Sequence, residues 1–302
     1  MLDLHRLRLL REFHDRGTVA AVADALGYSP SAVSQQLRVL EVEAKARLLE
    51  REGRRIVLTA AGHVLVAHAN QLLEGVERAE SEVAAVQDDV GGTVRIAAFQ
   101  STIVTLVLPM LAELRREYPR LRIEVHQAEP QEALEALRRR DVDLVIADEY
   151  EYAPRASANT FIREDLLREP VRLASAAEHP LAAAATPVLL RSLANHAWVS
   201  GTSGSAHDQL LQRACRTHGG FTPDVRHRSD DLTGLLALIA DGHVIGLLPD
   251  LVWRHGGGGV RVRDVGDGPL TRTVFTATRT AHAAHPATAA VQAALRKGVH
   301  PQ

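Results

Sequence analysis

The sequence predicts an α/β protein that carries a small helical domain at its N-terminus. Three observations lead to this fold class. Short helical segments with capping residues run to about Glu43, a long stretch without proline follows, and strand-like and helical runs alternate from Thr93 onward. The 302 residues, 46% of them hydrophobic, are enough for more than one core.

The chain begins with apolar residues at helical spacing, which predict a first helix over residues 3–15. Thr18 can cap a second, short helix over residues 19–25, because its hydroxyl can accept a hydrogen bond from an early backbone N–H. Gly27 then allows a tight turn.

A third helix is expected from Pro30 to about Glu43. Ser29 is its N-cap, and Pro30 sits at the first position, where no N–H is needed and φ is already suitable. Residues 51–58 follow as a hairpin with a basic tip. Together these elements predict a winged helix-turn-helix over residues 1–58. The alternative at this point is a small helical core with polar outer faces.

The segment 59–90 is predicted to form a long linker helix, with Thr59 as N-cap and no proline over residues 63–88. Its apolar residues recur mostly every three or four positions, so they form a stripe that needs a partner. We expect the stripe to hold a dimer, although packing against its own chain is the alternative. The predicted dimerisation residues are Leu65, Leu72, Val76 and Val83.

Residues 91–302 are expected to form an α/β domain with largely parallel sheets and two subdomains. Subdomain I is placed at about 93–160 and 269–298, subdomain II at about 161–268, with crossovers near Phe161 and Pro269. The expected strands are 94–99, 121–126, 144–147, 171–174, 198–200, 244–248 and 273–278. The expected helices include 101–117, 130–140, 205–217 and 231–241.

Composition and charge exclude several other classes. No apolar stretch reaches the roughly 18 residues of a membrane helix, and no secretory signal is evident, so we expect a cytoplasmic protein without membrane contact. The one cysteine, Cys215, excludes an intramolecular disulfide and is expected to be a buried apolar residue. Residues 1–58 hold ten Arg and Lys against eight Asp and Glu. This small positive excess is compatible with DNA binding but does not by itself indicate it.

No enzyme chemistry is predicted. Ser203 lies in Gly201-Thr202-Ser203-Gly204, which is not the G-x-S-x-G elbow of hydrolases, so no catalytic residue is assigned. His282 and His285 have the spacing of a metal pair but lack nearby cysteine or carboxylate ligands. We therefore expect neither a metal nor a cofactor.

Residues 20–62 strongly resemble the LysR-type transcriptional regulators, and the resemblance extends over essentially the whole chain. The shared pattern comprises paired alanines, V-S-x-Q-L-x-x-L-E, L-x-x-R and L-T-x-A-G. The matching residues are Ala20, Ala21, Val33, Ser34, Gln36, Leu37, Leu40, Glu41, Leu48, Arg51, Leu58, Thr59, Ala61 and Gly62. The stretches 179–182 and 242–249 are weaker echoes of the family.

Three departures from the family pattern stand out. The usual glutamine-proline opening of the recognition helix is replaced by Ser29-Pro30-Ser31, which puts a base contact of that glutamine in doubt. A glycine common at the end of this helix is replaced near Lys45, which can alter the helix end, and Leu49 stands where phenylalanine is common.

The resemblance implies that the third helix enters the major groove of double-stranded DNA. Glutamine can bind adenine and arginine can bind guanine through paired hydrogen bonds, whereas the arginines of the wing suit phosphates or a narrow minor groove. The predicted DNA-binding residues are Ser29, Ser31, Ser34, Gln35, Arg38, Arg54 and Arg55. Plain solvent exposure is the alternative for each.

The resemblance also implies that residues 91–302 form an effector-binding domain like that of periplasmic binding proteins. Ligands of open α/β sheets bind beyond the carboxyl ends of strands, and two such ends here carry hydroxyls that open helices. We predict a small carboxylate or amino acid as effector, although simple helix capping is the alternative. The predicted effector-binding residues are Gln100, Ser101, Thr102, Gly201, Thr202 and Ser203.

The implied protein is a homodimer or tetramer that binds promoter DNA, contacts RNA polymerase and responds to a small molecule. One rival is a nucleoid or replication-control protein with the same DNA domain. Another is a cytoplasmic enzyme or solute-binding module whose helical N-terminus resembles a DNA reader by coincidence.

Overall fold

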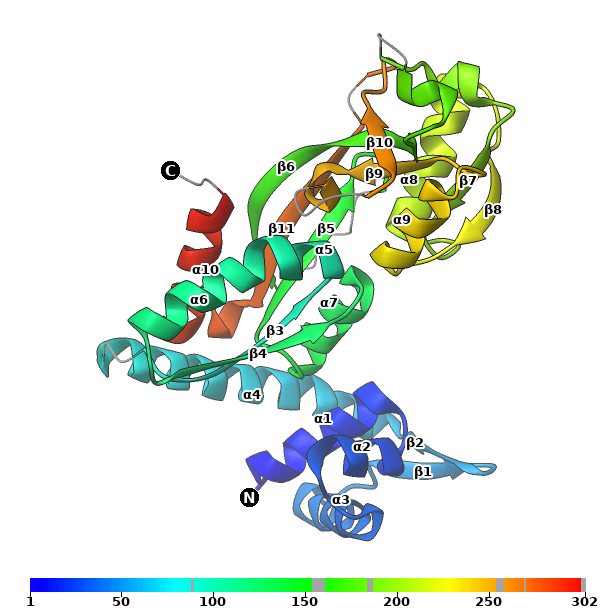
Figure 1. Ribbon diagram of the computed structural model, residues 1–302. Coiled ribbons are helices and arrows are strands. Elements are labelled where there is room, and N and C mark those ends of the chain that lie inside the picture. The colour runs from blue at the N-terminus through cyan, green and yellow to red at the C-terminus, as the bar shows by residue number, and fades with distance from the viewer. Residues whose placement is uncertain (88–89, 154–160, 184–186, 254–257, 269, 300–302) are drawn as a thin grey trace. The chain divides into compact units, whose positions relative to one another are not determined.

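The computed structural model describes residues 1–87, 90–153, 161–183, 187–253, 258–268 and 270–299 (Figure 1). The chain divides into two compact units. The N-terminal unit comprises residues 1–89 with 281–286, and the C-terminal unit comprises residues 90–280 with 287–302.

The N-terminal unit is a helical bundle with one hairpin, as the sequence predicts. Its elements are α1 (Leu4–Arg16), α2 (Val19–Leu26), α3 (Pro30–Ala44), β1 (Leu49–Glu52), β2 (Arg55–Leu58) and α4 (Ala60–Gln87). The predicted caps are confirmed, because Thr18 accepts from the N–H of Ala21 and Ser29 accepts from the N–H of Ala32. Leucines and valines from α1, α3 and the first turns of α4 share one buried core.

The end of α3 carries an unusual backbone conformation. Lys45 has φ of 52°, in the left-handed region, and its N–H bonds back to the carbonyls of Glu41 and Val42. Side chains with a Cβ are disfavoured in this conformation, which is why glycine normally ends helices in this way. The helix therefore ends in the usual left-handed cap, but a lysine occupies the position that glycine normally takes.

Lys45→Gly is expected to stabilise the N-terminal unit by about 1 kcal/mol, because removal of the Cβ relieves the left-handed strain. Arg140→Gly is the matched control: among the described residues, Arg140, at φ 66°, is the other non-glycine with positive φ, and it belongs to the C-terminal unit. Scanning calorimetry of the full chain should show each variant raising one transition. An unchanged or lowered transition for Lys45→Gly would contradict the strain.

The C-terminal unit is built on a seven-stranded sheet with two further strands beside it. Its strands are β3 (Gly92–Ala98), β4 (Leu121–Gln127), β5 (Leu144–Tyr150), β6 (Phe161–Ala176), β7 (Ala197–Ser200), β8 (Asp224–Arg228), β9 (Gly246–Pro249), β10 (Val260–Arg263) and β11 (Thr271–Arg279). Its helices are α5 (Gln100–Thr102), α6 (Leu108–Glu117), α7 (Pro130–Arg139), α8 (Ala206–Ala214), α9 (Leu232–Ala240) and α10 (Pro286–Val299), which begins at the last residue of the N-terminal unit. A π-helical turn, Ile103–Val107, joins α5 to α6.

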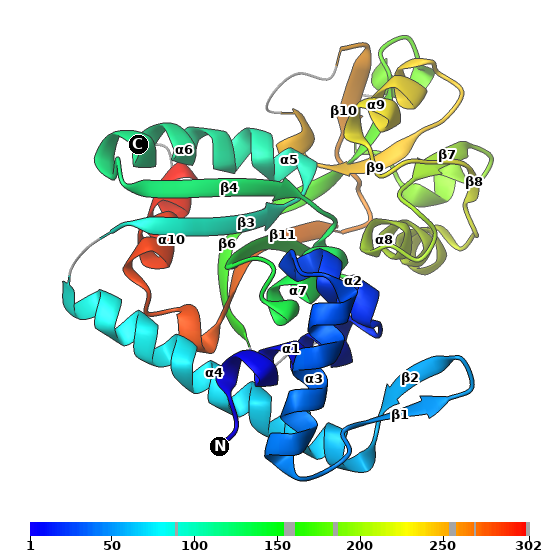
Figure 2. The ribbon, with the colours of Figure 1, turned by 90° about the horizontal axis from the view of Figure 1, so that it is seen from below.

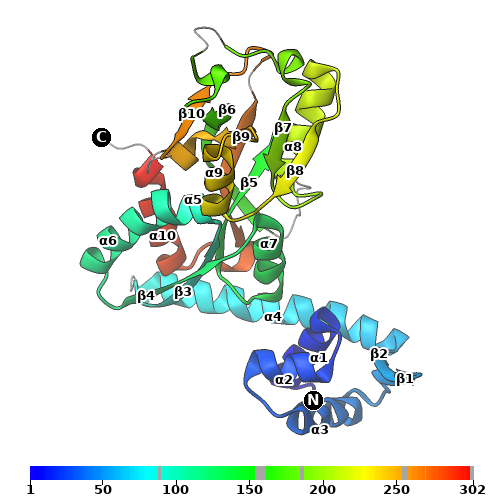
Figure 3. The same cartoon turned by 45° about the vertical axis from the view of Figure 1, so that its right-hand side comes forward.

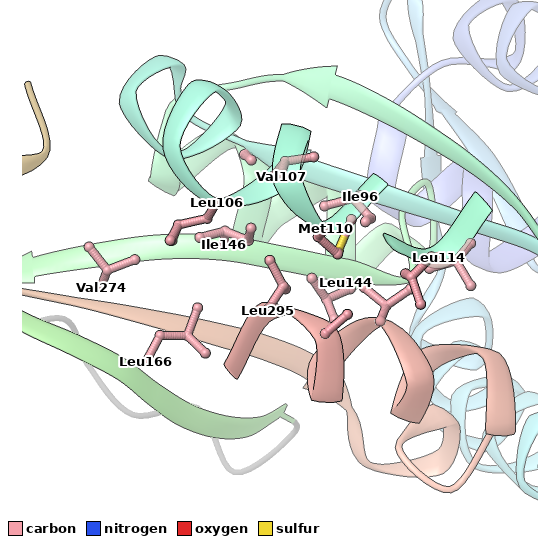
Figure 4. Close-up of a cluster of buried hydrophobic side chains, with 14 of the residues drawn as sticks. Ile96, Leu106, Val107, Met110, Leu114, Leu144, Ile146, Leu166, Val274 and Leu295 are labelled. Atoms are coloured by element: carbon pink, nitrogen blue, oxygen red, sulfur yellow. The ribbon is translucent and has the colours of Figure 1, made fainter. Parts of the chain in front are cut away.

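Two layers of helices cover the sheet of subdomain I. Alternate residues of β3 and β5 point to opposite faces, so Ile96 and Ile146 pack under α6 and α10 while Ala97 and Val145 pack under α7. Figure 4 shows the first of these cores, and Figure 2 shows α6 running beside β3 and β4. Subdomain II repeats the scheme, with α8 over one core and α9 over another.

The expectation of largely parallel sheets is wrong. Parallel pairs join β3 to β4 and β5, and β7 to β8, but the remaining named pairings are antiparallel. The reason is that the two long strands β6 and β11 run against each other and belong to the same sheet as β5. Strands β8 and β10 were not predicted.

The crossover between subdomains also differs from the prediction. Strand β6 begins at Phe161, but it pairs with β11 as far as Pro170 and with β9 from Val171. The change from one subdomain to the other therefore occurs within β6. The second predicted crossover, at Pro269, lies outside the described residues. Thr271 at the start of β11 pairs with Pro170, so both connecting strands pass the same point.

Cys215 begins a π-helical turn after α8 and is fully buried. Burial raises the pKa of its thiol to about 12, so the thiol stays protonated and behaves as an apolar group, as predicted.

None of the helices in the described part of the chain combines the length and apolarity that a bilayer crossing needs.

Candidate DNA-binding and effector sites

The outward face of α3 carries the polar residues that the sequence singled out. Val33, Leu37 and Leu40 are buried in the core of the N-terminal unit. The opposite side leaves Gln35 and Arg38 exposed. Ser31 is also exposed and Ser34 is half-buried. Ser29 is exposed, but its hydroxyl is used for capping, because it accepts from the N–H of Ala32 at 3.2 Å and lies 3.0 Å from the Ser31 hydroxyl.

The wing is a two-residue hairpin. Glu52 pairs with Arg55, so Gly53 and Arg54 form the loop, and Gly53 supplies the positive φ of 62° that such a loop requires. Arg54 and Arg55 are exposed at this tip. The hairpin thus presents two adjacent guanidinium groups to solvent.

Motif residues outside the predicted contact set hold the wing in place. The carboxylate of Glu41 accepts from the N–H groups of Leu48 and Leu49, at 2.8 and 3.2 Å, and so ties α3 to β1. Thr59 donates to the carbonyl of Arg47 at 2.8 Å while it caps α4 through the N–H of Gly62. These residues belong to the family pattern, but their spacing alone does not show that they clamp the hairpin.

Gly62 allows the close approach of α4 to the wing. A Cβ at this position would lie 2.3 Å from the carbonyl oxygen of Leu48, which is a backbone clash that no side-chain movement relieves. In a separate contact between α1 and α3, Arg6 donates to Glu43 and Gln36, and the Arg6 hydrogen bond holds the pKa of the Glu43 carboxyl below its ordinary value. Gln36 is therefore occupied inside the domain, unlike Gln35.

Helix α4 exposes most of its predicted stripe. Leu72, Val76 and Val83 are 48%, 36% and 60% exposed, whereas Leu65 packs against the core of its own unit. Three large apolar residues on one face of a long helix are unusual for solvent contact. This packing weakens the prediction that Leu65 contacts a partner helix. Leu72, Val76 and Val83 remain candidates for such a contact.

The C-terminal unit contains a cavity of about 360 Å³ that brings the two predicted loops together. Five of the six predicted effector residues line it: Gln100, Ser101, Gly201, Thr202 and Ser203. Thr102 does not. It is fully buried and its hydroxyl donates to the carbonyl of Phe99 at 2.8 Å, because the first helical turn directs it back into the core.

Gln100 bridges the two subdomains across the cavity. Its side-chain oxygen accepts from the N–H of Leu232 at 2.8 Å, and its amide donates to Asp231 at 3.3 Å. Asp231 is itself the N-cap of α9. The start of α5 therefore meets the start of α9, as Figure 3 shows. A residue predicted as a ligand contact thus also joins the two subdomains.

The loop after β7 is held by the protein's own acceptors. The N–H of Gly201 donates to His207 at 3.1 Å, that of Thr202 to Asp230 at 2.8 Å, and that of Gly204 to Asp208 at 3.0 Å. The Thr202 hydroxyl also bonds to Asp230. Within the described residues, no bond uses the N–H groups of Ser203, Ala206 or His207.

The cavity wall also contains charged groups that the sequence analysis missed. Arg272 donates to Glu169 at 2.7 Å and to Asp148 at 3.4 Å, and the three residues are 3%, 6% and 5% exposed. Arg272 and Asp148 line the cavity. They come from β11 and β5, which are far apart in sequence, so no local motif marks them.

His207 is a neutral hydrogen-bonding residue. Burial lowers its pKa, its Nε2 lies 2.6 Å from the carbonyl of Leu247, and its Nδ1 accepts from Gly201. The proton is therefore on Nε2.

The rings of His282 and His285 stack with their centres 5.0 Å apart. The described residues contain no group of three side chains placed to hold a metal.

Comparison with known proteins identifies both parts of the chain. Residues 4–63 match the family model of the bacterial regulatory helix-turn-helix protein, lysR family, and residues 87–299 match that of the LysR substrate binding domain. The chain belongs to the LysR family of transcriptional regulators. This family consists of DNA-binding regulators with an effector-binding domain and is not enzymatic, which removes the enzyme alternative.

Individual relatives match this LysR-type chain over different shares of its length, from about half to most of it. The transcriptional dual regulator GltC of Bacillus subtilis is 29% identical over 250 residues, which cover 82% of this chain and 81% of that protein. The nitrogen assimilation regulatory protein nac of Escherichia coli is 30% identical over 168 residues, or 55% and 54% of the two chains.

Solved structures share the fold. A cysteine-to-aspartate variant of full-length OxyR from Pseudomonas aeruginosa aligns with a TM-score of 0.70 at 20% identity, over 99% of this chain and 95% of that one. Full-length BenM aligns with a TM-score of 0.57 at 22% identity, over 98% and 96%.

Proposed function

We propose that this LysR-type regulator binds promoter DNA sequence-specifically as a homodimer or dimer of dimers, under the control of a small effector in the cavity. The observation that carries the proposal is the exposed face of α3 with Gln35 and Arg38, in the same unit as a hairpin tip that exposes Arg54 and Arg55. The exposed face of α3 can form hydrogen bonds with base edges, and the hairpin tip carries positive charge that suits the phosphates of the DNA backbone. Ser29, Ser31 and Ser34 are proposed to contribute further DNA contacts.

The effector is proposed to be a small carboxylate or an amino acid, bound by Gln100, Ser101, Gly201, Thr202 and Ser203. The N–H groups in the first turn of α8 support binding of a carboxylate, because helix N-termini attract anions. The bound regulator is proposed to contact RNA polymerase at the promoter and to act in the cytoplasm. An imperfect palindrome would match the two-fold symmetry of a dimer.

A genome-wide map of binding sites tests this function. A promoter regulator should occupy a small set of sites, including DNA beside its own gene, and occupancy should change with growth conditions. A nucleoid or replication-control protein would instead bind very many sites or cluster at the replication origin. Such a distribution would contradict the proposal.

Gln35→Ala is expected to lower specific binding while leaving non-specific binding unchanged. A base-edge contact carries about 1–3 kcal/mol of discrimination. Fluorescence anisotropy on specific and scrambled duplexes measures both affinities. Gln36→Ala is the matched control, because Gln36 accepts a hydrogen bond from Arg6 within the domain and should change stability without changing discrimination. Equal losses on both duplexes for Gln35→Ala would reassign Gln35 to backbone contact or folding.

A further inference from the structure

The charges that line the effector cavity are predominantly negative. Among the described lining residues, Glu129, Asp148 and Asp230 are acidic, and Arg272 is the one arginine or lysine. His207 adds no positive charge, because its Nδ1 accepts a hydrogen bond and burial lowers its pKa. The formal charges of the described lining residues therefore sum to a net negative value.

Arg272 is not available to neutralise an anionic ligand. Its guanidinium donates twice to Glu169, at 2.7 and 2.5 Å, and once to Asp148. Glu169 is held in turn by the N–H of Leu251 at 2.5 Å. The buried cluster thus contains two carboxylates and one guanidinium. In a poorly solvated environment, the excess negative charge repels another carboxylate and attracts a cation.

The loop after β7 offers an anion little more. Its N–H groups at Gly201, Thr202 and Gly204 already bond to His207, Asp230 and Asp208. A carboxylate that took these donors would leave their present acceptors unpaired near its own charge. The N–H groups that remain for an anion are those in the first turn of α8 and that of Ser203. They are enough to bind one small anionic group.

Aromatic rings complete the wall. Phe99 and Tyr150 line the cavity, and both are nearly buried. The guanidinium of Arg272 already lies 5.1 Å from the centre of the Phe99 ring. Aromatic faces near carboxylates form a favourable environment for a cationic group that has left water.

We propose that the effector carries a positively charged amino group, which binds beside Asp148 and Glu129. This inference rests on the proposed effector function of the cavity and selects the amino-bearing alternative over a simple carboxylate. The cavity identifies the site, and the charges identify the chemistry of its ligand. Its volume, about 360 Å³, is at the lower end of small-molecule sites and suits a compound of amino-acid size.

Thermal shift of the full chain with matched compounds tests the inference. The probes are the standard α-amino acids, the corresponding carboxylic acids without the amino group, and the corresponding amines without the carboxyl group. A ligand that binds only the folded chain stabilises it by RT ln(1 + [L]/Kd), so the midpoint rises as the ligand concentration exceeds Kd. We expect at least one amino acid or amine to raise the midpoint of unfolding, and its partner without the amino group to raise it far less.

Two variants locate the interaction. Glu129→Gln should weaken the binding of that compound about fivefold, which is the effect of losing one charged hydrogen bond at an exposed position. Glu132→Gln is the matched control, because Glu132 is exposed in the first turn of α7, whose N-cap is Glu129, but does not line the cavity. It should bind the compound as the parent does. The midpoints without ligand check that both variants fold.

The inference is overturned if the acids without an amino group bind as well as the amino acids, if no amino compound binds, or if Glu129→Gln leaves binding unchanged. The proposed function is tested separately, by the effect of each bound compound on affinity for promoter DNA. A carboxylic acid that binds and changes DNA affinity would contradict the amino group while leaving the regulator intact. Absence of any sequence-specific DNA binding would contradict the regulator itself.

Discussion

Replacement of both wing arginines, Arg54→Ala with Arg55→Ala, is expected to weaken binding to every duplex. Each phosphate contact releases condensed counterions, so two lost contacts should flatten the slope of log K against log salt by about 1.8. The same relation gives a loss of roughly 60-fold in affinity near 0.1 M salt. The loss should be similar on specific and scrambled DNA, because phosphates carry no sequence information.

A second arginine pair controls for net charge. Arg115 and Arg116 are adjacent and exposed on α6, in the C-terminal unit, so their replacement by alanine removes the same two charges outside the DNA-binding unit. Anisotropy titrations over a range of salt concentrations should show the parent slope for this control. A wing variant that keeps the parent slope would remove Arg54 and Arg55 from the interface.

Leu72→Glu is expected to convert the proposed dimer to monomers. In a two-fold interface, the same stripe of α4 meets its copy, so one substitution places two carboxylates in apolar surroundings. An uncompensated buried charge costs about 3–5 kcal/mol, which raises the dissociation constant of the dimer by roughly 150-fold to several thousandfold. Sedimentation at micromolar protein concentration should report the monomer mass, and affinity for a two-half-site duplex should fall with it.

Ala67→Glu is the matched control for this prediction. Ala67 is exposed on the same helix, but it lies five residues before Leu72 and therefore about 140° around the helix axis. The added charge is the same, and the dimer should persist. A Leu72→Glu protein that still sediments as a dimer would place the interface elsewhere.

Local chemistry was sufficient to predict the N-terminal unit. Thr18, Ser29 and Thr59 cap helices through hydrogen bonds to residues three positions further on, so their role depends only on neighbours in sequence. The two-residue turn at Gly53 and Arg54 is equally local. The linker stripe was predicted from periodicity, which does not distinguish a partner helix from the chain's own core, and Leu65 packs on that core.

The C-terminal unit depends more on distant contacts. Strand β6 was predicted only in part, since its first half is rich in charged residues such as Arg163, Glu164 and Asp165, which obscure strand alternation. The loops of the cavity were found because strand ends and hydroxyls are visible in sequence. Arg272 and Glu169 were missed because they meet across 103 residues, and Thr102 was misassigned because its rotation into the core is set by the helix geometry.

The central claim is that α3 and the wing, contributed by two copies of the chain, bind specific DNA near a promoter. Quantitative footprinting of the full chain on the DNA that flanks its own gene tests this claim most directly. We predict two protected half-sites with centres about 10.5 base pairs, or a multiple of that, apart. This protection should persist in the Arg115→Ala and Arg116→Ala control and vanish in the Arg54→Ala and Arg55→Ala variant. Uniform protection without half-sites, or equal protection by the wing variant, would contradict it.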